Sequence, residues 1–157
     1  MKNKIDDKKL SLIKAAFAFL FKAPLNYSVT LCKTGPWGNH YLLTNHTTMV
    51  AISFEYDYMK IFVTVSKIEE GNLIDSEVIK SKVTLDLDNF MFFKYPDEYL
   101  KQDQTQESFF DVKEIKRVLN YYANVLQKYT ASTLTGDFTI VSEIDIYVKN
   151  RIKKGDP

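Results

Sequence analysis

The sequence predicts an α+β fold: an N-terminal helix, an antiparallel meander of four to five strands, and C-terminal helices packed on one sheet face. Three observations support this prediction. Apolar residues recur at helical spacing near both ends of the chain, they alternate with polar residues in the stretch between, and glycine, proline and asparagine separate these segments. With 157 residues, we expect a single domain over residues 1–157.

The first predicted element is a helix over residues 7–22. Asp6 and Asp7 are candidate caps at its start, and Pro24 ends it because proline cannot continue a helix. One apolar stripe along this helix is expected to pack in the core, and it consists of Leu10, Ile13, Phe17, Leu20 and Phe21.

Short strands follow the helix. Residues 27–33 and 41–44 are rich in β-branched and aromatic residues, and Gly35-Pro36-Trp37-Gly38 separates them as a turn. A second turn at Asn45-His46 leads into the next strand. These segments predict the first half of an antiparallel meander.

The third and fourth strands form the best-specified hairpin. A turn centred on Asp57-Tyr58 places every apolar residue of both strands on one face and sets Glu55 opposite Lys60. A shift of one residue would move the whole apolar set into water, so the register is well determined. The predicted apolar pairs are Tyr56 with Met59, Phe54 with Ile61, Ile52 with Val63, and Val50 with Val65.

In the second half of the chain the sequence predicts one more strand, followed by helices. Residues 79–87 alternate as a fifth strand, Asp88-Asn89 is a candidate cap for a short helix over 90–93, and residues 97–107 are polar and expected to be loop. Asp111, with Glu114 three residues later, predicts the start of a long helix. The apolar face of this long helix consists of Val112, Ile115, Leu119, Tyr122, Leu126 and Tyr129. A final helix, capped by Asp137, has an apolar face of Val141, Ile144, Val148 and Ile152.

Charge is segregated along the chain although the net charge is only +1. Residues 55–111 carry thirteen Asp and Glu against six Lys, whereas both flanking parts are basic. Only Arg117 and Arg151 are arginine, which weighs against nucleic-acid binding, since arginine makes the bidentate contacts to phosphate and guanine. The apolar run at residues 15–21 is too short for a membrane span, so a cytoplasmic location is expected.

No motif points to catalysis, a cofactor or a metal. His40 and His46 are too few for a zinc site, and the glycine pattern of phosphate-binding loops is absent from the sequence. Cys32, the single cysteine, is expected to be an inert thiol packed in a strand. It could instead meet His40 across a hairpin as a nucleophile and base, which leaves an enzymatic alternative open.

What remains is the surface. Trp37, between two glycines, either folds back over the hydrophobic edge of the sheet or stands exposed as an anchor for a partner. The acidic residues either form a solvated face or a negative patch that steers a basic partner. The predicted contact residues are Trp37, Glu55, Asp57, Glu69, Glu70, Asp75 and Glu77.

The run "NHYLLTNHTTMVAISFEYDYMKIFVTVSKI", followed by "VTLDLDNF" and a long closing helix, resembles the immunity proteins of bacterial polymorphic toxin and contact-dependent growth-inhibition systems. The resemblance is one of layout over most of the chain. It implies a monomeric, non-enzymatic α+β protein without a cofactor. Such a protein binds and neutralises a cognate toxin domain, expected to be a nuclease, by blocking its active site or substrate surface. The alternatives are a secretion chaperone or adaptor, which would dimerise, and an enzyme using carboxylates or Cys32.

Overall fold

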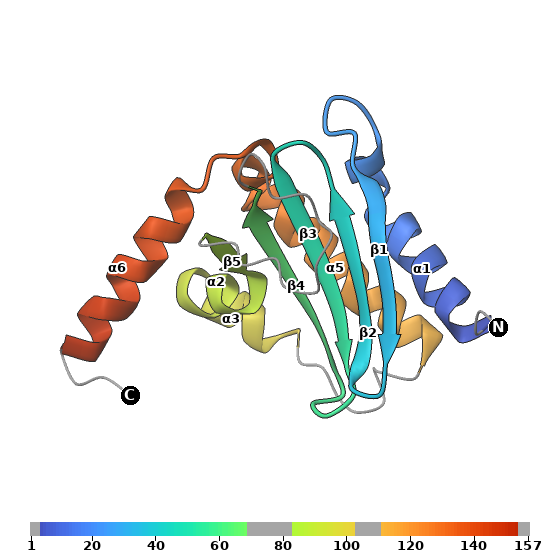
Figure 1. Cartoon of the computed structure of the whole chain (residues 1–157). Helices are drawn as coiled ribbons and strands as arrows, with labels where there is room; N and C mark the ends of the chain where they lie inside the picture. The colour runs from blue at the N-terminus through green and yellow to red at the C-terminus, as the bar shows by residue number, and fades with distance from the viewer. Residues whose placement is uncertain (1–3, 69–82, 103–110, 154–157) are drawn as a thin grey trace.

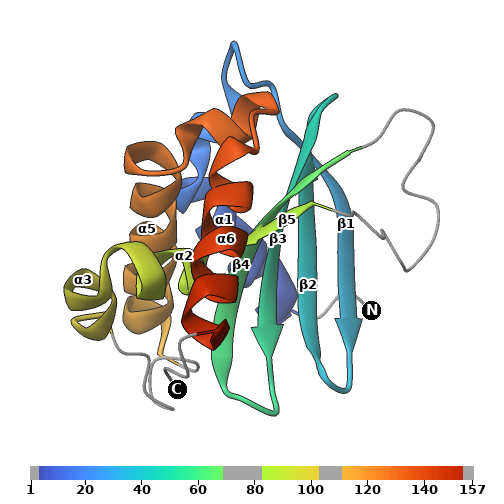
Figure 2. The ribbon, with the colours of Figure 1, turned by 90° about the vertical axis from the view of Figure 1, so that its left-hand side faces the viewer.

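The computed structural model describes residues 4–68, 83–102 and 111–153 (Figure 1). Within them the chain forms one five-stranded antiparallel sheet in the order β1-β2-β3-β4-β5, with helices packed on one of its faces, which confirms the α+β prediction. Figure 2 shows the helical layer and the sheet side by side. The elements are α1 (Lys4–Ala16), η1 (Ala18–Phe21), β1 (Ser28–Gly35), β2 (Gly38–Thr44), β3 (Thr48–Glu55), β4 (Lys60–Lys67), β5 (Thr84–Asp86), α2 (Leu87–Lys94), α3 (Pro96–Leu100), α5 (Val112–Lys128), η2 (Ala131–Thr135) and α6 (Thr139–Lys153).

The β3–β4 hairpin has the predicted register. Glu55 pairs with Lys60, and the apolar pairs behind them continue in step down both strands. Their side chains are buried because they face the helical layer, as the alternation of apolar residues requires. The pairs observed are Phe54 with Ile61, Ile52 with Val63, and Val50 with Val65.

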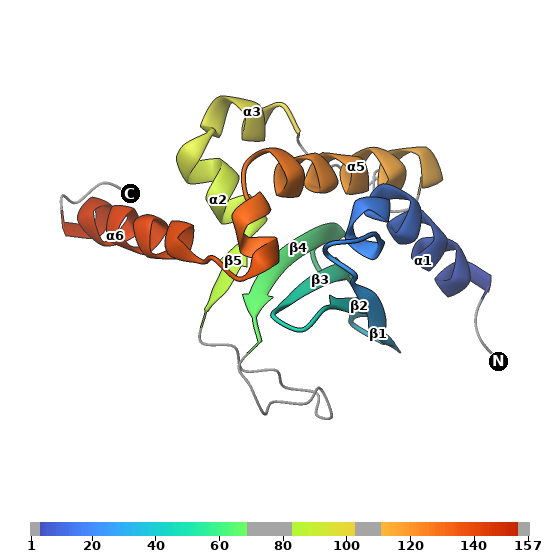
Figure 3. The ribbon, with the colours of Figure 1, turned by 90° about the horizontal axis from the view of Figure 1, so that it is seen from above.

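The core lies between this sheet face and helices α1 and α5, which pack against each other (Figure 3). The predicted stripe of the first helix is confirmed at Ile13, Phe17 and Leu20, all fully buried. Helix α5 buries a broad apolar face along its length, because its apolar residues recur at the spacing of helical turns. The buried residues of α5 are Ile115, Val118, Leu119, Tyr122, Ala123, Val125 and Leu126.

The N-terminal helix differs from its predicted bounds. It begins at Lys4, so Asp6 and Asp7 lie inside α1 instead of preceding it as caps. The α-helix ends at Ala16, and a tighter 3₁₀ turn, η1, carries the chain on to Phe21. There the amide of Leu20 donates to the carbonyl of Phe17 at 2.9 Å, and this change of pitch keeps both side chains in the core.

The segment between the sheet and α5 also departs from expectation. Strand β5 has three residues, and the predicted positions 79–82 lie outside the described residues. Asp86, not Asp88, caps α2, since its carboxylate accepts the amide of Asn89 at 3.0 Å. Residues 97–100, expected as loop, are helical because Pro96 opens α3 at a position where its missing N–H is not needed.

Strand β1 forms one edge of the sheet, and Cys32 on it is exposed. Cys32 thus lies in a strand as predicted but its side chain is not packed in the core, because the predicted alternation identified the strand and not its place at the sheet edge. At the other side of the molecule α6 extends beside α2, and an ion pair of 3.6 Å joins Lys94 of α2 to Glu143 of α6 (Figure 1). In the described part of the chain, no helix is both long and apolar enough to cross a bilayer.

Candidate binding surface at one end of the sheet

Two turns lie together at one end of the sheet, at the bottom of Figure 1. The β1–β2 turn carries Trp37, and the β3–β4 turn carries Asp57 and Tyr58. The amide of Tyr56 donates to the carbonyl oxygen of Trp37 at 3.0 Å and ties the turns to each other. Trp37 is 67% exposed and Tyr58 70% exposed, so this end presents two large aromatic side chains. The interpretation in which Trp37 folds back over the sheet edge is wrong.

Local sequence explains how the two turns come so close. A Cβ atom at Gly38 would lie 2.2 Å from the carbonyl oxygen of Phe54, well inside van der Waals contact, so only glycine lets β2 start against β3 here. The second turn closes at Met59, whose φ of 48° is left-handed. Tyr58 is fixed from outside the turn by an edge-to-face contact with Phe62, with ring centroids 6.2 Å apart.

The charges at this end are partly matched. Glu55 stands opposite Lys60 in the register, and its carboxylate lies 3.9 Å from Nδ1 of His40. The same His40 nitrogen is 3.0 Å from the hydroxyl of Ser53, so the ring is held along the strand. Asp57 is exposed in the turn. The structure thus brings the predicted contact residues Trp37, Glu55 and Asp57 to one surface, which we call the sheet-end surface together with Tyr58.

The other predicted contact residues, Glu69, Glu70, Asp75 and Glu77, lie outside the described residues. The chain leaves the described part at Ile68, whose amide donates to Thr47 at 2.8 Å. Thr47 belongs to the β2–β3 turn, at the end of the sheet opposite Trp37. The sheet-end surface is therefore defined by Trp37, Glu55, Asp57 and Tyr58 alone.

The possible Cys32–His40 pair is not assembled. Cys32 stands opposite Tyr41 in the β1–β2 ladder, whereas His40 stands opposite Lys33. Because successive side chains of a strand point to opposite faces, Cys32 and His40 lie on different sides of the sheet. Among the described residues, no group of three or more His, Cys, Asp or Glu side chains is placed to hold a metal ion.

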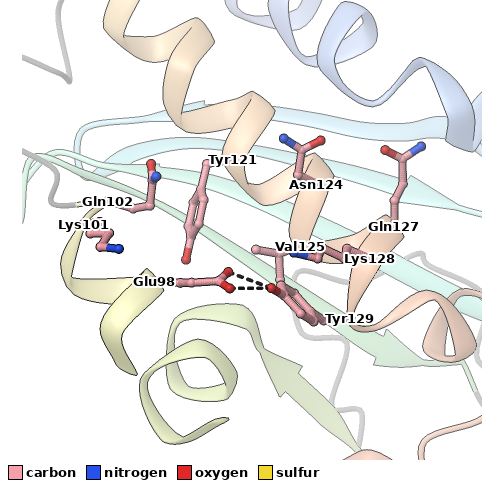
Figure 4. A pocket seen from close by; sticks show the side chains of 9 residues that line it. All are labelled: Glu98, Lys101, Gln102, Tyr121, Asn124, Val125, Gln127, Lys128 and Tyr129. Carbon is pink, nitrogen blue, oxygen red and sulfur yellow. Dashed lines mark hydrogen bonds between the residues drawn. The ribbon is translucent and has the colours of Figure 1, made fainter. Parts of the chain in front are cut away.

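A tyrosine-lined pocket between α3 and α5 is a feature that the sequence reasoning missed (Figure 4). Its volume is about 450 Å³, and a smaller one of about 140 Å³ adjoins it, with Gln102 and Tyr121 shared by both. Lys60, the first residue of β4, lines the smaller pocket and connects it to the sheet-end surface. The one available signal was that five of the ten tyrosines lie between residues 95 and 129.

The buried Tyr122 hydroxyl and the half-buried Asp88 carboxylate lie at the smaller pocket. The Tyr122 hydroxyl donates to Asp88 Oδ1 at 2.8 Å and lies 3.0 Å from the carbonyl oxygen of Ile61. Burial raises the pKa of Asp88, an effect opposed by this hydrogen bond, and burial together with the Asp88 charge raises the pKa of Tyr122 well above its ordinary value. Burial also raises the pKa of Tyr121 to about 12, so both tyrosines remain neutral hydroxyls at neutral pH.

Comparisons with models of protein families, with curated proteins and with solved structures each found no match for this chain. Its function is therefore inferred from the arrangement of its own residues.

Proposed function

We propose that this protein is an immunity protein that binds a cognate bacterial toxin domain and neutralises it by covering the active site or substrate surface of the toxin. The observation that carries the proposal is the sheet-end surface, where Trp37 and Tyr58 are both more than half exposed. Tryptophan and tyrosine are the residues most enriched at the energetic centres of protein interfaces. Held by the hydrogen-bonded turns, they can bind with little loss of conformational freedom.

The charge of this surface favours a basic partner. Asp57 is exposed in the turn beside Tyr58, and Glu55 is the last residue of β3 before that turn. A nuclease toxin is basic where it meets phosphate, so carboxylates beside aromatic anchors are suited to occupy that surface. The layout of a leading helix, a β-meander and closing helices supports the same proposal through the resemblance to immunity proteins.

The direct test is complex formation with the protein encoded by the adjacent gene. We expect a stable one-to-one complex on size exclusion with light scattering, and loss of the toxic activity of that protein when the complex forms. No complex with either neighbouring gene product would count against the proposal. A free protein that is a stable dimer would instead favour the chaperone alternative, because such adaptors associate through large apolar interfaces.

The contribution of charge can be tested separately. Asp57→Lys should slow association with the toxin and change its dependence on salt, since the local field at the turn reverses. Glu143→Lys is the control, because it makes the same charge change on α6, which lies away from the two turns; it also breaks the ion pair with Lys94, which is not part of the sheet-end surface. An equal effect of both substitutions would remove Asp57 from the interface.

A further inference from the structure

The hydroxyl of Tyr121 lies buried at the junction of the two pockets between α3 and α5 (Figure 4). It has no hydrogen-bond partner among the described residues, although buried polar groups of proteins are nearly always paired. Tyr121 projects from helix α5 and lines both pockets, so its hydroxyl is held in place beside them. The pocket therefore offers a hydrogen-bonding group that the fold itself does not use.

Glu98, an exposed residue of α3, lines the larger pocket. Tyr129 Oη lies 2.8 and 2.7 Å from its two oxygens, so one hydroxyl orients a side chain that would otherwise rotate freely in solvent. Tyr129 is itself fixed by the ring of Tyr95, whose centroid is 4.1 Å away. A carboxylate held in one orientation is suited to a charged donor with fixed geometry.

One of the tyrosine rings that line the pocket already contacts a positively charged side chain. The ammonium group of Lys128 lies 4.8 Å from the centroid of the Tyr129 ring, at the rim of the pocket. After burial, the Asp88 carboxylate raises the pKa of the Tyr121 hydroxyl most, and Tyr99 and the Glu98 carboxylate raise it further. Lys101 and Lys128 also line the pocket, but both are exposed, and their long side chains can move into solvent when a guest enters.

We propose that this pocket receives an arginine side chain of the partner, with the guanidinium between the Glu98 carboxylate and the Tyr121 hydroxyl and against the tyrosine rings. A guanidinium fits because it is planar, donates several hydrogen bonds in a fixed fork and stacks on aromatic faces. The inference rests on the proposed function, in which the toxin is basic. Leu100, 69% exposed, and Lys60 border the smaller pocket, so a partner on the sheet-end surface lies within reach.

The test uses the full chain labelled with ¹⁵N and the peptide N-acetyl-Gly-Arg-Gly-amide as the probe. We expect saturable shifts of the amide resonances of residues 98–102 and 121–129. The citrulline peptide, of the same shape without the charge, should bind at least about threefold more weakly. Glu98→Gln and Tyr121→Phe should each weaken arginine binding by a similar factor. Their controls are Asp97→Asn, a neighbouring charge removal outside the pocket lining, and Tyr41→Phe, a hydroxyl removal at a buried residue of β2 that lines neither pocket.

Several results would overturn this inference. The citrulline peptide could bind as tightly as the arginine peptide, or N-acetyl-Gly-Glu-Gly-amide could bind more tightly than it. The resonance shifts could be confined to residues outside 98–102 and 121–129. Finally, Glu98→Gln could change arginine binding no more than Asp97→Asn does. The outcome is separable from the proposed function. A stable toxin complex without arginine-specific shifts overturns the pocket alone, whereas arginine-specific shifts in a protein that captures no neighbouring gene product overturn the immunity role and leave a cation-binding pocket.

Discussion

The amide of Tyr56 donates a hydrogen bond of 3.0 Å to the carbonyl oxygen of Trp37, and through it the two turns at one end of the sheet become a single unit. The adjacent ladder pair of Gly38 and Glu55 continues this link into the β2–β3 pairing. Because both turns are anchored to paired strands, the exposed aromatic side chains on them are presented in a defined arrangement.

Gly38→Ala should destabilise the protein by about 1–3 kcal/mol, the usual range for an added group in a packed position. The new Cβ would meet the carbonyl oxygen of Phe54 at 2.2 Å, and backbone atoms cannot swing aside as a side chain can. Urea denaturation followed by circular dichroism measures the change.

Gly35→Ala is the matched control, because its Cβ would find its nearest neighbour at 3.9 Å, an ordinary contact. It should remain within about 0.5 kcal/mol of the wild type. Equal stability of the two variants would show that β2 does not approach β3 as closely as described.

Trp37→Ala should separate binding from folding. The side chain is exposed, so the free energy of unfolding should change by less than about 0.5 kcal/mol. If Trp37 anchors the partner, the complex should weaken by about 2 kcal/mol or more, equivalent to roughly thirtyfold in Kd. Isothermal titration calorimetry with the neighbouring gene product measures this. Ile146→Ala, also at an exposed apolar residue but on α6, should leave Kd unchanged, and equal losses for both variants would argue against a special role of Trp37.

The β3–β4 register could be predicted because two constraints agree. The apolar residues of both strands share a period of two. A turn at Asp57-Tyr58 places all of these apolar residues on one face and, in the same register, pairs Glu55 with Lys60 on the other face. The start of α2 could not be predicted in the same way. Asp86 and Asp88 are both good caps, and the choice is settled by tertiary packing, which buries Leu87 as the first helical residue.

The sheet-end surface and the tyrosine pocket could be predicted only in part, because both depend on tertiary packing. The position of Trp37 in a turn follows from the flanking glycines, but its exposure depends on how the two hairpins pack. The tyrosine pocket has still less signal, since Glu98 and Tyr129 are 31 residues apart and meet only when α3 and α5 pack. Pairing of that kind depends on helix orientation, which a single sequence does not encode in a local pattern.

Asp111→Ala should destabilise the protein by about 0.5–2 kcal/mol, as expected for loss of a helix cap. The Asp111 carboxylate accepts the amides of Lys113 and Glu114 at 2.8 and 3.3 Å, and α5 carries much of the core. Asp111→Asn retains an oxygen acceptor and should recover most of the loss in thermal or urea denaturation. A similar loss for Asn and Ala would show that charge near the helix N-terminus, not the hydrogen bonds, supplies the stabilisation.

The pH dependence of stability should report on Asp88. Burial raises its pKa above the ordinary value of 3.8, so the folded protein keeps this proton to higher pH than the unfolded chain does. The free energy of unfolding therefore falls as pH rises from about 3.8 through the raised pKa, and this contribution is constant above it. Asp88→Asn cannot ionise, and its amide oxygen can still accept from Tyr122. Its stability should accordingly lack this fall in urea denaturation between pH 4 and 7.

Tyr122→Phe should move the pH-dependent fall in stability to higher pH, whereas Asp88→Asn should abolish it. The Tyr122 hydroxyl donates to Asp88 at 2.8 Å and lowers its pKa against the effect of burial, so removing the hydroxyl should raise the pKa of Asp88 further. The fall in stability then extends to higher pH, and the variant also loses about 1–3 kcal/mol because the buried acceptor is left without its donor. Titration of the Asp88 side-chain carbon by NMR measures the pKa directly. An unchanged Asp88 pKa in Tyr122→Phe would mean that this hydrogen bond does not control its ionisation.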